Sequence, residues 1–268
     1  MKKPQRGASM TNSLRVFSAP LWPVRQSRRP LLGIIGIFLV SLAAADAGAA
    51  SHEPPGPSPA LPAAHELSRA ADFEAESVSA EARHLTNWVL HSENNKGMPF
   101  VIVDKANAKV FLFSGNGRLR GAAPALLGLA RGDDSVPGIG DRKLSTILPE
   151  ERTTPAGRFV AALGPNLLGQ TVLWVDYDAA ISLHRVLTSK PEERRLERLR
   201  SASPLEHRIT YGCINVPARF YDKLVRPTFS RTNGIVYVLP ETRSARKEFA
   251  SYDPALLDGK ASGNNRPQ

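Results

Sequence analysis

The residue with the most evident chemistry is Cys213, the only cysteine among 268 residues. It cannot form a disulfide within the chain, so it is a buried apolar residue, a partner for another chain, or a reactive thiol. A free thiol is mostly protonated near neutral pH and needs help to act as a nucleophile. A helix that begins at Pro217 would favour the thiolate, and a histidine could take its proton.

Two of the six histidines, His184 and His207, lie in the strand-rich part of the sequence. We favour His184 as the partner of Cys213, because a rigid strand fixes its imidazole, whereas His207 belongs to a charged insertion. From composition alone the alternatives stay open: an inert buried thiol and a strand histidine bonded to a backbone carbonyl. One cysteine and two histidines do not supply a zinc ligand set, so we predict no metal and no cofactor.

The elements that must hold these residues are mainly short strands. Apolar runs bounded by turn residues predict strands at 100–104, 108–113, 153–163, 171–177, 180–186 and 234–240, and an irregular or edge strand at 121–130. The run 180–186 should form a hairpin with the run before it, which places Ser182 and His184 on one face. The predicted fold class is therefore mainly β.

Two helices are expected beside the strands. The first covers about 79–92 and has one apolar stripe, formed by Ala82, Leu85, Trp88 and Val89. The second begins at Pro217, buries Phe220, Leu224 and Val225, and ends at Arg226-Pro227. Both should dock on the strand-rich domain.

Two polar segments interrupt the predicted strands. Residues 131–152 are rich in glycine and broken by prolines, which predicts a long surface loop of the kind that often carries function. Residues 189–208 carry many charges and few leucines, which predicts a short solvated helix and a loop. The sequence contains no internal repeat and no glycine motif for nucleotide binding.

The N-terminal residues have the order of a secretory signal: basic residues without an acid, then an apolar run at 31–45, then small residues. We predict a signal peptide at 1–47, cleaved or kept as a membrane anchor, and a location in the periplasm or cell envelope. The remaining predicted segments are a proline-rich tether at 48–78, a docking helix at 79–97, a strand-rich domain at 98–240 and a flexible tail at 241–268.

The formal charge of +10 lies mostly in the N-terminal segment, and the chain that follows it carries only +4. Basic residues are not interleaved with aromatic residues anywhere. We therefore predict that the protein does not bind nucleic acid. We also expect a monomer.

Three motifs in one order point to a known family. His184 is followed after an interval by Thr210-Tyr211-Gly212-Cys213-Ile214-Asn215, and both are preceded by the strand TTPAGRF at 153–159 and the strand pair VIVDKANAKVFLF. Over roughly 98–240 the sequence resembles the catalytic domain of the L,D-transpeptidase (YkuD-like) family. Two departures are Tyr211, which stands where the family has a second histidine, and the charged insertion between His184 and the cysteine motif. Tyrosine is a poor base near neutral pH, so its presence affects the rate and the choice of acceptor.

The resemblance implies acyl transfer on the stem peptides of peptidoglycan, and hence a β-rich catalytic domain. Cys213 would attack the carbonyl of the diamino acid at the third stem position, release the terminal D-alanine and hold the donor as a thioester. His184 would act as general base and then as acid, oriented by a nearby backbone carbonyl. An amine of a neighbouring stem would complete a crosslink, whereas water would give a carboxypeptidase.

The same resemblance assigns supporting roles. Backbone N–H groups of Gly212 and Cys213 would bind the oxyanion, and Tyr211 either adds a donor or packs. Residues expected to shape the cleft or its loop are Thr210, Asn215, Thr154 and Gly157. The insertion is either a solvated helix or a lid whose Arg194, Arg195 or Arg198 meets carboxylates of the substrate.

Two other functions fit the same residues. One is a wall-binding scaffold that keeps the fold and has lost turnover through Tyr211. The other is a thiol-dependent hydrolase that acts on an amide outside the cell wall.

Overall fold

The structure is a computed structural model that describes residues 70–254. The predicted signal peptide at 1–47, most of the tether and the end of the predicted tail lie outside these residues. Within residues 70–254 no helix is long and apolar enough to cross a membrane.

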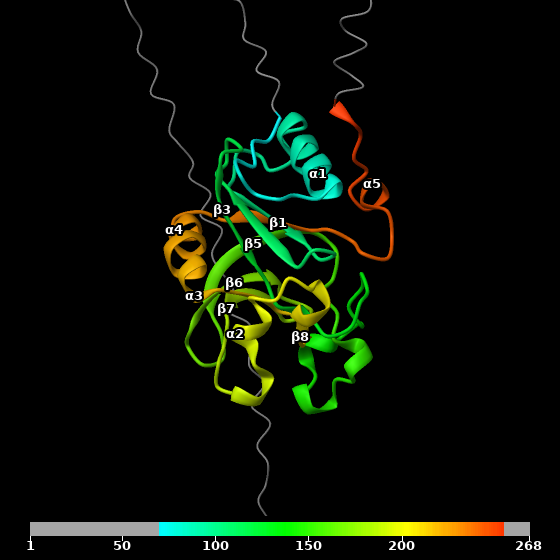
Figure 1. Ribbon diagram of the computed structural model, residues 1–268, viewed down its shortest axis with the longest axis vertical. Coiled ribbons are helices and arrows are strands. Elements are labelled where there is room, and N and C mark those ends of the chain that lie inside the picture. Colours follow the sequence, from blue (N-terminus) through cyan, green and yellow to red (C-terminus); the bar gives the residue numbers. More distant parts are fainter. Residues whose placement is uncertain (1–69, 255–268) are drawn as a thin grey trace, which may run out of the picture. The chain divides into compact units, whose positions relative to one another are not determined.

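The fold is mainly β, as predicted, and its centre is a sheet of eight strands in the order β3-β2-β1-β10-β5-β6-β7-β9 (Figure 1). The strands of this sheet are β1 (Phe100–Asp104), β2 (Lys109–Phe113), β3 (Leu119–Pro124), β5 (Gly157–Pro165), β6 (Thr171–Asp176), β7 (Ile181–Arg185), β9 (Ile214–Val216) and β10 (Gly234–Val238). A second, two-stranded sheet pairs β4 (Leu127–Gly128) with β8 (Arg208–Thr210). Neighbouring strands are antiparallel except in the pairs β1 with β10, β7 with β9 and β4 with β8.

Central strands are buried on both faces, which explains their uninterrupted apolar sequences. In β1, Val101 and Val103 join one core cluster, while Phe100 and Ile102 join the other. In Figure 1, α1 (Ala80–His91) and α5 (Ala245–Glu248) lie on one side of β1, and residues of α1 belong to the second cluster. The helices after Cys213 contribute to the first cluster, which also holds residues of β6, β7 and β9.

The N-terminal helix forms as predicted. The hydroxyl of Ser79 accepts a hydrogen bond from the N–H of Ala82 and caps the first turn. The buried residues include the whole predicted stripe: Ala82, Leu85, Trp88 and Val89. The amphipathic pattern alone therefore located this helix.

The helix after Pro217 continues beyond its predicted end at Arg226-Pro227, so this prediction is wrong. It runs as α3 (Ala218–Phe220), a π-helical turn η6 (Tyr221–Val225) and α4 (Arg226–Phe229). The π-helical turn shifts the hydrogen-bond register ahead of Pro227. Pro227 thus falls in the first turn of a new α-helical segment, where its missing N–H costs nothing.

The two polar segments contain only short turns of helix. The loop at 131–152 holds the 3-10 turns η1 (Ile139–Asp141), η2 (Leu144–Thr146) and η3 (Pro149–Glu151). The insertion at 189–208 holds η4 (Pro191–Glu193), α2 (Arg195–Arg198) and η5 (Pro204–His207). Its predicted short helix is thus present as α2.

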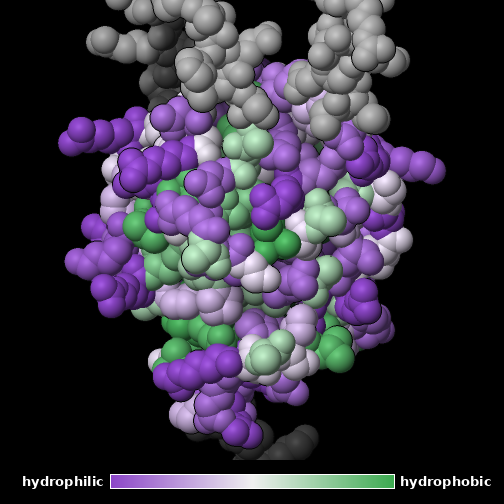
Figure 2. Space-filling view, turned by 45° about the horizontal axis from the view of Figure 1, so that its top comes forward, coloured by the Kyte–Doolittle hydropathy of each residue, from purple (hydrophilic) through white to green (hydrophobic). Residues whose placement is uncertain are grey.

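Residues on both sides of the predicted strand-rich domain, 98–240, also belong to its core. Phe73, within the predicted tether, is buried and makes edge contacts with the rings of Phe111 and Phe113. Phe249, within the predicted flexible tail, is buried in the same cluster. Isolated aromatic residues in polar segments give no periodic signal, so the sequence did not place them in the core. The surface in Figure 2 is mostly hydrophilic, with apolar residues in small groups.

Candidate active site

Cys213 and His184 come together because β7 and β9 are adjacent and parallel. In their register Leu183 pairs with Ile214 and His184 pairs with Asn215. Cys213 precedes β9 directly, and the imidazole of His184 is near enough to lower the pKa of its thiol. The charged insertion lies between these strands in sequence, and the strand pairing brings His184 and Cys213 together in spite of it.

Cys213 is partly exposed as a residue, and polar groups surround its sulfur. Its Sγ lies 3.7 Å from Oγ of Ser182 and 3.8 Å from the carbonyl oxygen of Ala180. Burial opposes ionisation, but the nearby imidazole of His184 and the backbone and hydroxyl of Ser182 outweigh it. Together they hold the pKa of the Cys213 thiol below its ordinary value. A nucleophilic thiol requires this direction of shift.

The imidazole of His184 is held on its other side by backbone and amide groups. Nδ1 lies 2.8 Å from the carbonyl oxygen of Arg185, and Nε2 lies 3.1 Å from Nδ2 of Asn215. A carbonyl oxygen can only accept, so Nδ1 carries a proton. The backbone carbonyl expected near this histidine is therefore that of Arg185.

A tight turn presents Cys213 to the site. The hydroxyl of Thr210 donates to the carbonyl oxygen of Cys213 at 2.7 Å and accepts the N–H of Gly212 at 3.1 Å. Gly212 has a φ of 123°, and a Cβ there would come within 2.5 Å of the carbonyl oxygen of Thr153. Only glycine fits this turn. Because the N–H of Gly212 is engaged by Thr210, it does not point freely at a substrate, contrary to the expected oxyanion role.

Thr154 supports this turn from behind. Its hydroxyl donates to the carbonyl oxygen of Gly212 at 2.8 Å and accepts the N–H of Gly128 at 2.9 Å. The side chain is buried, with 1% exposed. Thr154 thus fixes the backbone next to the nucleophile. The other residue expected in the cleft wall, Gly157, pairs with Val238 in the central sheet.

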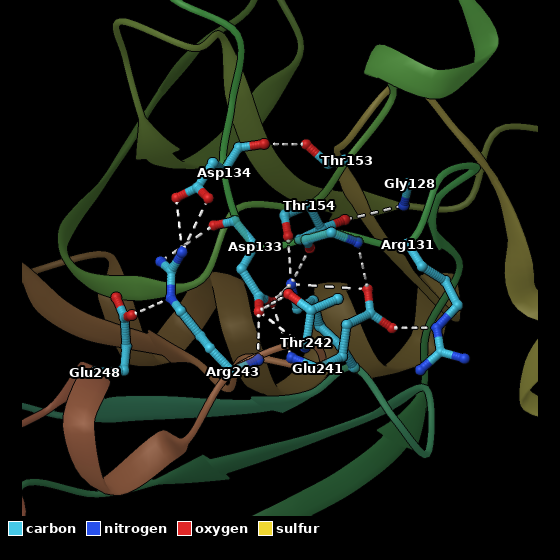
Figure 3. Close-up of polar contacts among 12 residues, drawn as sticks. Gly128, Arg131, Asp133, Asp134, Thr153, Thr154, Glu241, Thr242, Arg243 and Glu248 are labelled. Carbon is cyan, nitrogen blue, oxygen red and sulfur yellow. Dashed lines mark hydrogen bonds and ion pairs between the residues drawn. The ribbon is translucent and has the colours of Figure 1, made fainter.

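Behind Thr154 lies a buried ionic cluster, and Figure 3 shows Asp133, Thr154, Glu241 and Thr242 in it. The ammonium group of Lys105 is fully buried and donates to Oδ1 of Asp133 at 2.8 Å and to the carbonyl oxygen of Thr154 at 2.8 Å. Glu241 also contacts the guanidinium of Arg208 at 2.6 Å. The cluster therefore joins four segments that are far apart in sequence to the backbone that carries Thr154.

Burial and the contacts within the cluster shift the pKa values of Lys105 and Asp133. Burial lowers the pKa of Lys105, although the hydrogen bond and charge of Asp133 act in the opposite direction. For Asp133, burial alone would raise the pKa, but hydrogen bonds from Lys105, Thr242 and backbone N–H groups hold it well below its usual range. Lys105 and Asp133 were not predicted to lie near the site, because an isolated charged residue after a strand or in a loop is usually exposed.

Tyr211 faces an arginine of the loop at 131–152. The guanidinium carbon of Arg152 lies 4.0 Å from the centre of the Tyr211 ring, a cation–π contact. Arg152 also donates to the carbonyl oxygen of Ile147. Tyr211 is thus a packing partner for a cation.

The insertion at 189–208 sends one of its arginines into the site. Arg194 is exposed and pairs with Glu197, while Arg198 donates to the carbonyl oxygens of Glu193 and Glu206. Arg195 instead donates from Nη1 to Oδ1 of Asn215 at 2.7 Å. Of the three arginines expected to meet a substrate, Arg195 is the one in contact with the residues around His184.

Comparisons with known proteins leave the family unassigned. No family model matches the chain, and no curated protein matches it. A solved structure described as the LD transpeptidase LdtMt1 in complex with imipenem is similar, with a TM-score of 0.30 and 14% identity. The match covers 53% of this chain and 58% of that chain. Similarity at this level is too weak to support a function, so the geometry around Cys213 must carry the assignment.

In the part of the chain that the structure describes, no three His, Cys, Asp or Glu residues are grouped so that they could hold a metal ion. The groups gathered around Cys213 are a histidine, a serine and backbone amides. This set is suited to nucleophilic attack by a thiol on a carbonyl carbon.

Proposed function

We propose that the protein is a cysteine acyltransferase that acts on the stem peptides of peptidoglycan, an L,D-transpeptidase. The observation that carries this proposal is the parallel pairing of β7 with β9, which brings His184 beside Cys213, together with the lowered pKa of the thiol. The order of the motifs around these two residues supports the choice of substrate, because it resembles that family in particular.

In the first half-reaction, Sγ of Cys213 bonds to the carbonyl carbon of the diamino acid at the third stem position. His184 takes the thiol proton, and the negative charge moves to the carbonyl oxygen. The N–H of Cys213 is the donor that we assign to this oxyanion, since the N–H of Gly212 is bound to Thr210. When the oxygen re-forms its double bond, the C–N bond to the terminal D-alanine breaks and the amine leaves with the proton from His184.

In the second half-reaction, an acceptor attacks the thioester. An amine on a neighbouring stem loses a proton to His184 and forms an amide, and the thiol leaves with that proton. Water in the same place yields a free carboxylate and a shortened stem. The contacts around Cys213 are common to both outcomes, so the acceptor decides between transpeptidase and carboxypeptidase activity.

We also propose that the protein works in the periplasm or cell envelope. This location rests on the basic and apolar N-terminal sequence, and it agrees with a substrate in the cell wall. A single cysteine is compatible with an oxidising compartment, because it has no partner in the same chain to pair with.

The test uses purified protein and stem tetrapeptides carried on disaccharides, with products identified by mass spectrometry. We expect loss of the terminal D-alanine together with dimers linked between two diamino acids, or tripeptides where water is the acceptor. Cys213→Ala is the matched control and should give neither product. Absence of both products with the unaltered protein would contradict the proposed substrate. If Cys213 then still reacted with other activated amides, the result would favour a hydrolase whose substrate is not part of the cell wall.

A further inference from the structure

Arg195 is placed to set the protonation pattern of the candidate active site. It begins α2, and its side chain is 14% exposed. One side of the guanidinium is held by the carboxylate of Glu193, and Nη1 donates to Oδ1 of Asn215 at 2.7 Å. Its neighbours Arg194 and Arg198 make no such contact among the described residues. The position of Arg195 is thus fixed from two sides.

The donors and acceptors in this chain of contacts can be assigned without ambiguity. A guanidinium has donors only, so the side-chain atom of Asn215 that faces Arg195 must be its oxygen. The amide nitrogen of Asn215 therefore faces Nε2 of His184, at 3.1 Å. This nitrogen also donates only, so Nε2 must accept and carries no proton.

The contact of the other ring nitrogen of His184 requires a proton on that nitrogen. Nδ1 lies 2.8 Å from the carbonyl oxygen of Arg185, which accepts only. The contacts of Arg195, Asn215 and Arg185 together select one form of the imidazole: neutral, with the proton on Nδ1 and the lone pair on Nε2.

We propose that Arg195 is a positioning residue that, through the amide of Asn215, holds His184 in the tautomer that can accept a proton. The inference deepens the proposed function, on which its catalytic consequence rests, because a general base for the Cys213 thiol needs an unprotonated ring nitrogen. Without Arg195 the amide of Asn215 is free to turn over. Its oxygen would then accept from Nε2–H, which favours the tautomer that cannot act as a base at that nitrogen.

The direct readout is the tautomer of His184, measured by ¹⁵N NMR of protein labelled in histidine, with His184→Gln used to assign its signals. We expect the unaltered protein to show a protonated Nδ1 and an unprotonated Nε2 in the neutral ring. In Arg195→Met the signals should move toward the other tautomer. In Arg195→Lys, whose ammonium also donates only, the original pattern should return. Arg200→Met, an exposed arginine of the same insertion, is the control and should show the original pattern.

The second readout is the rate at which a carbapenem acylates Cys213, followed by intact mass. Misplacing a catalytic group typically costs on the order of tenfold to a hundredfold in rate. We expect a loss of about that size in Arg195→Met, substantial recovery in Arg195→Lys, and no loss in Arg200→Met. Circular dichroism and urea unfolding establish that each variant is folded. Should Arg195→Met fail to fold, Arg195→Gln replaces it, and a mixture of the two tautomers is expected because its amide presents either a donor or an acceptor.

The two proposals fail separately. An unchanged His184 tautomer in a folded Arg195→Met or Arg195→Gln overturns the role of Arg195, whatever the protein acylates. If the unaltered protein is not acylated at all, the proposed function is contradicted, and the NMR comparison still decides whether Arg195 controls the tautomer. An acylation rate that falls equally in Arg195→Met and Arg195→Lys, with no change of tautomer, also counts against the role of Arg195.

Discussion

His184 and Asn215 face each other across the parallel strands β7 and β9, and Nδ2 of Asn215 lies 3.1 Å from Nε2 of the imidazole. The same strand pairing holds Cys213 next to Ser182, with 3.7 Å between the sulfur and the hydroxyl oxygen. The site is therefore a product of sheet register. A shift of one residue would turn His184 to the other face of the sheet.

The first prediction concerns the thiol. In His184→Ala the pKa of Cys213 should rise, because the imidazole that lowers it is removed while the burial that raises it remains. The alkylation rate plotted against pH should shift to higher pH. His91→Ala serves as control, since His91 is exposed and bonded to Tyr252. Superimposable curves for His184→Ala and the unaltered protein would show that the two residues are not coupled.

The second prediction concerns the support of the nucleophile turn. Thr154→Val keeps the shape of a buried side chain but leaves the carbonyl oxygen of Gly212 and the N–H of Gly128 without their partner. Such a loss costs about 1–3 kcal/mol of unfolding free energy, measured by urea denaturation. In Thr146→Val, whose hydroxyl is exposed, the change should stay within about 0.5 kcal/mol. Equal stability of the two variants would contradict the role given to Thr154.

The third prediction concerns the buried ion pair of Lys105 and Asp133, whose side chains are 0% and 1% exposed. Lys105→Met leaves the carboxylate of Asp133 in the interior without its cation, so we expect a loss of about 3–5 kcal/mol of unfolding free energy. Lys109→Met breaks the half-exposed pair with Glu76 and should cost at most about 1 kcal/mol. Similar losses in both variants would mean that the Lys105 pair does not behave as a buried one.

The fourth prediction concerns acid. Folding lowers the pKa of Asp133, so its carboxylate contributes stability that is present above the pKa of an unfolded aspartate, about 3.9, and is lost as the pH falls further. The difference in unfolding free energy between the unaltered protein and Asp133→Asn should therefore narrow from pH 6 to pH 3. The corresponding difference for Asp134→Asn, whose side chain is 79% exposed, should stay small throughout. If the difference in unfolding free energy between the unaltered protein and Asp133→Asn does not change with pH, the lowered pKa of Asp133 is contradicted.

Elements whose apolar residues recur at a regular spacing could be predicted from the sequence. The stripe of α1 is one such feature, and the hairpin of β6 and β7 is another, because apolar residues recur at fixed spacing in both. That hairpin placed Ser182 and His184 on one face, and the structure has both beside Cys213.

Features that depend on long-range polar contacts could not be predicted. Lys105 and Asp133 read as surface charges, and only the folded chain brings them together. Arg194, Arg195 and Arg198 look alike in sequence, and the one that reaches Asn215 is selected by the path of the insertion. The N–H of Gly212, expected to bind the oxyanion, is bonded to the hydroxyl of Thr210, and the spacing of the residues in the sequence does not reveal this contact.

The most direct test of the account is the intact mass of the protein after incubation with a carbapenem, an activated amide that an acylating thiol opens. We expect a covalent adduct on Cys213 at near full occupancy, much slower adduct formation in His184→Ala, and none in Cys213→Ala. An unmodified mass for the folded, unaltered protein would contradict the claim that Cys213 and His184 form an acyl-transfer site.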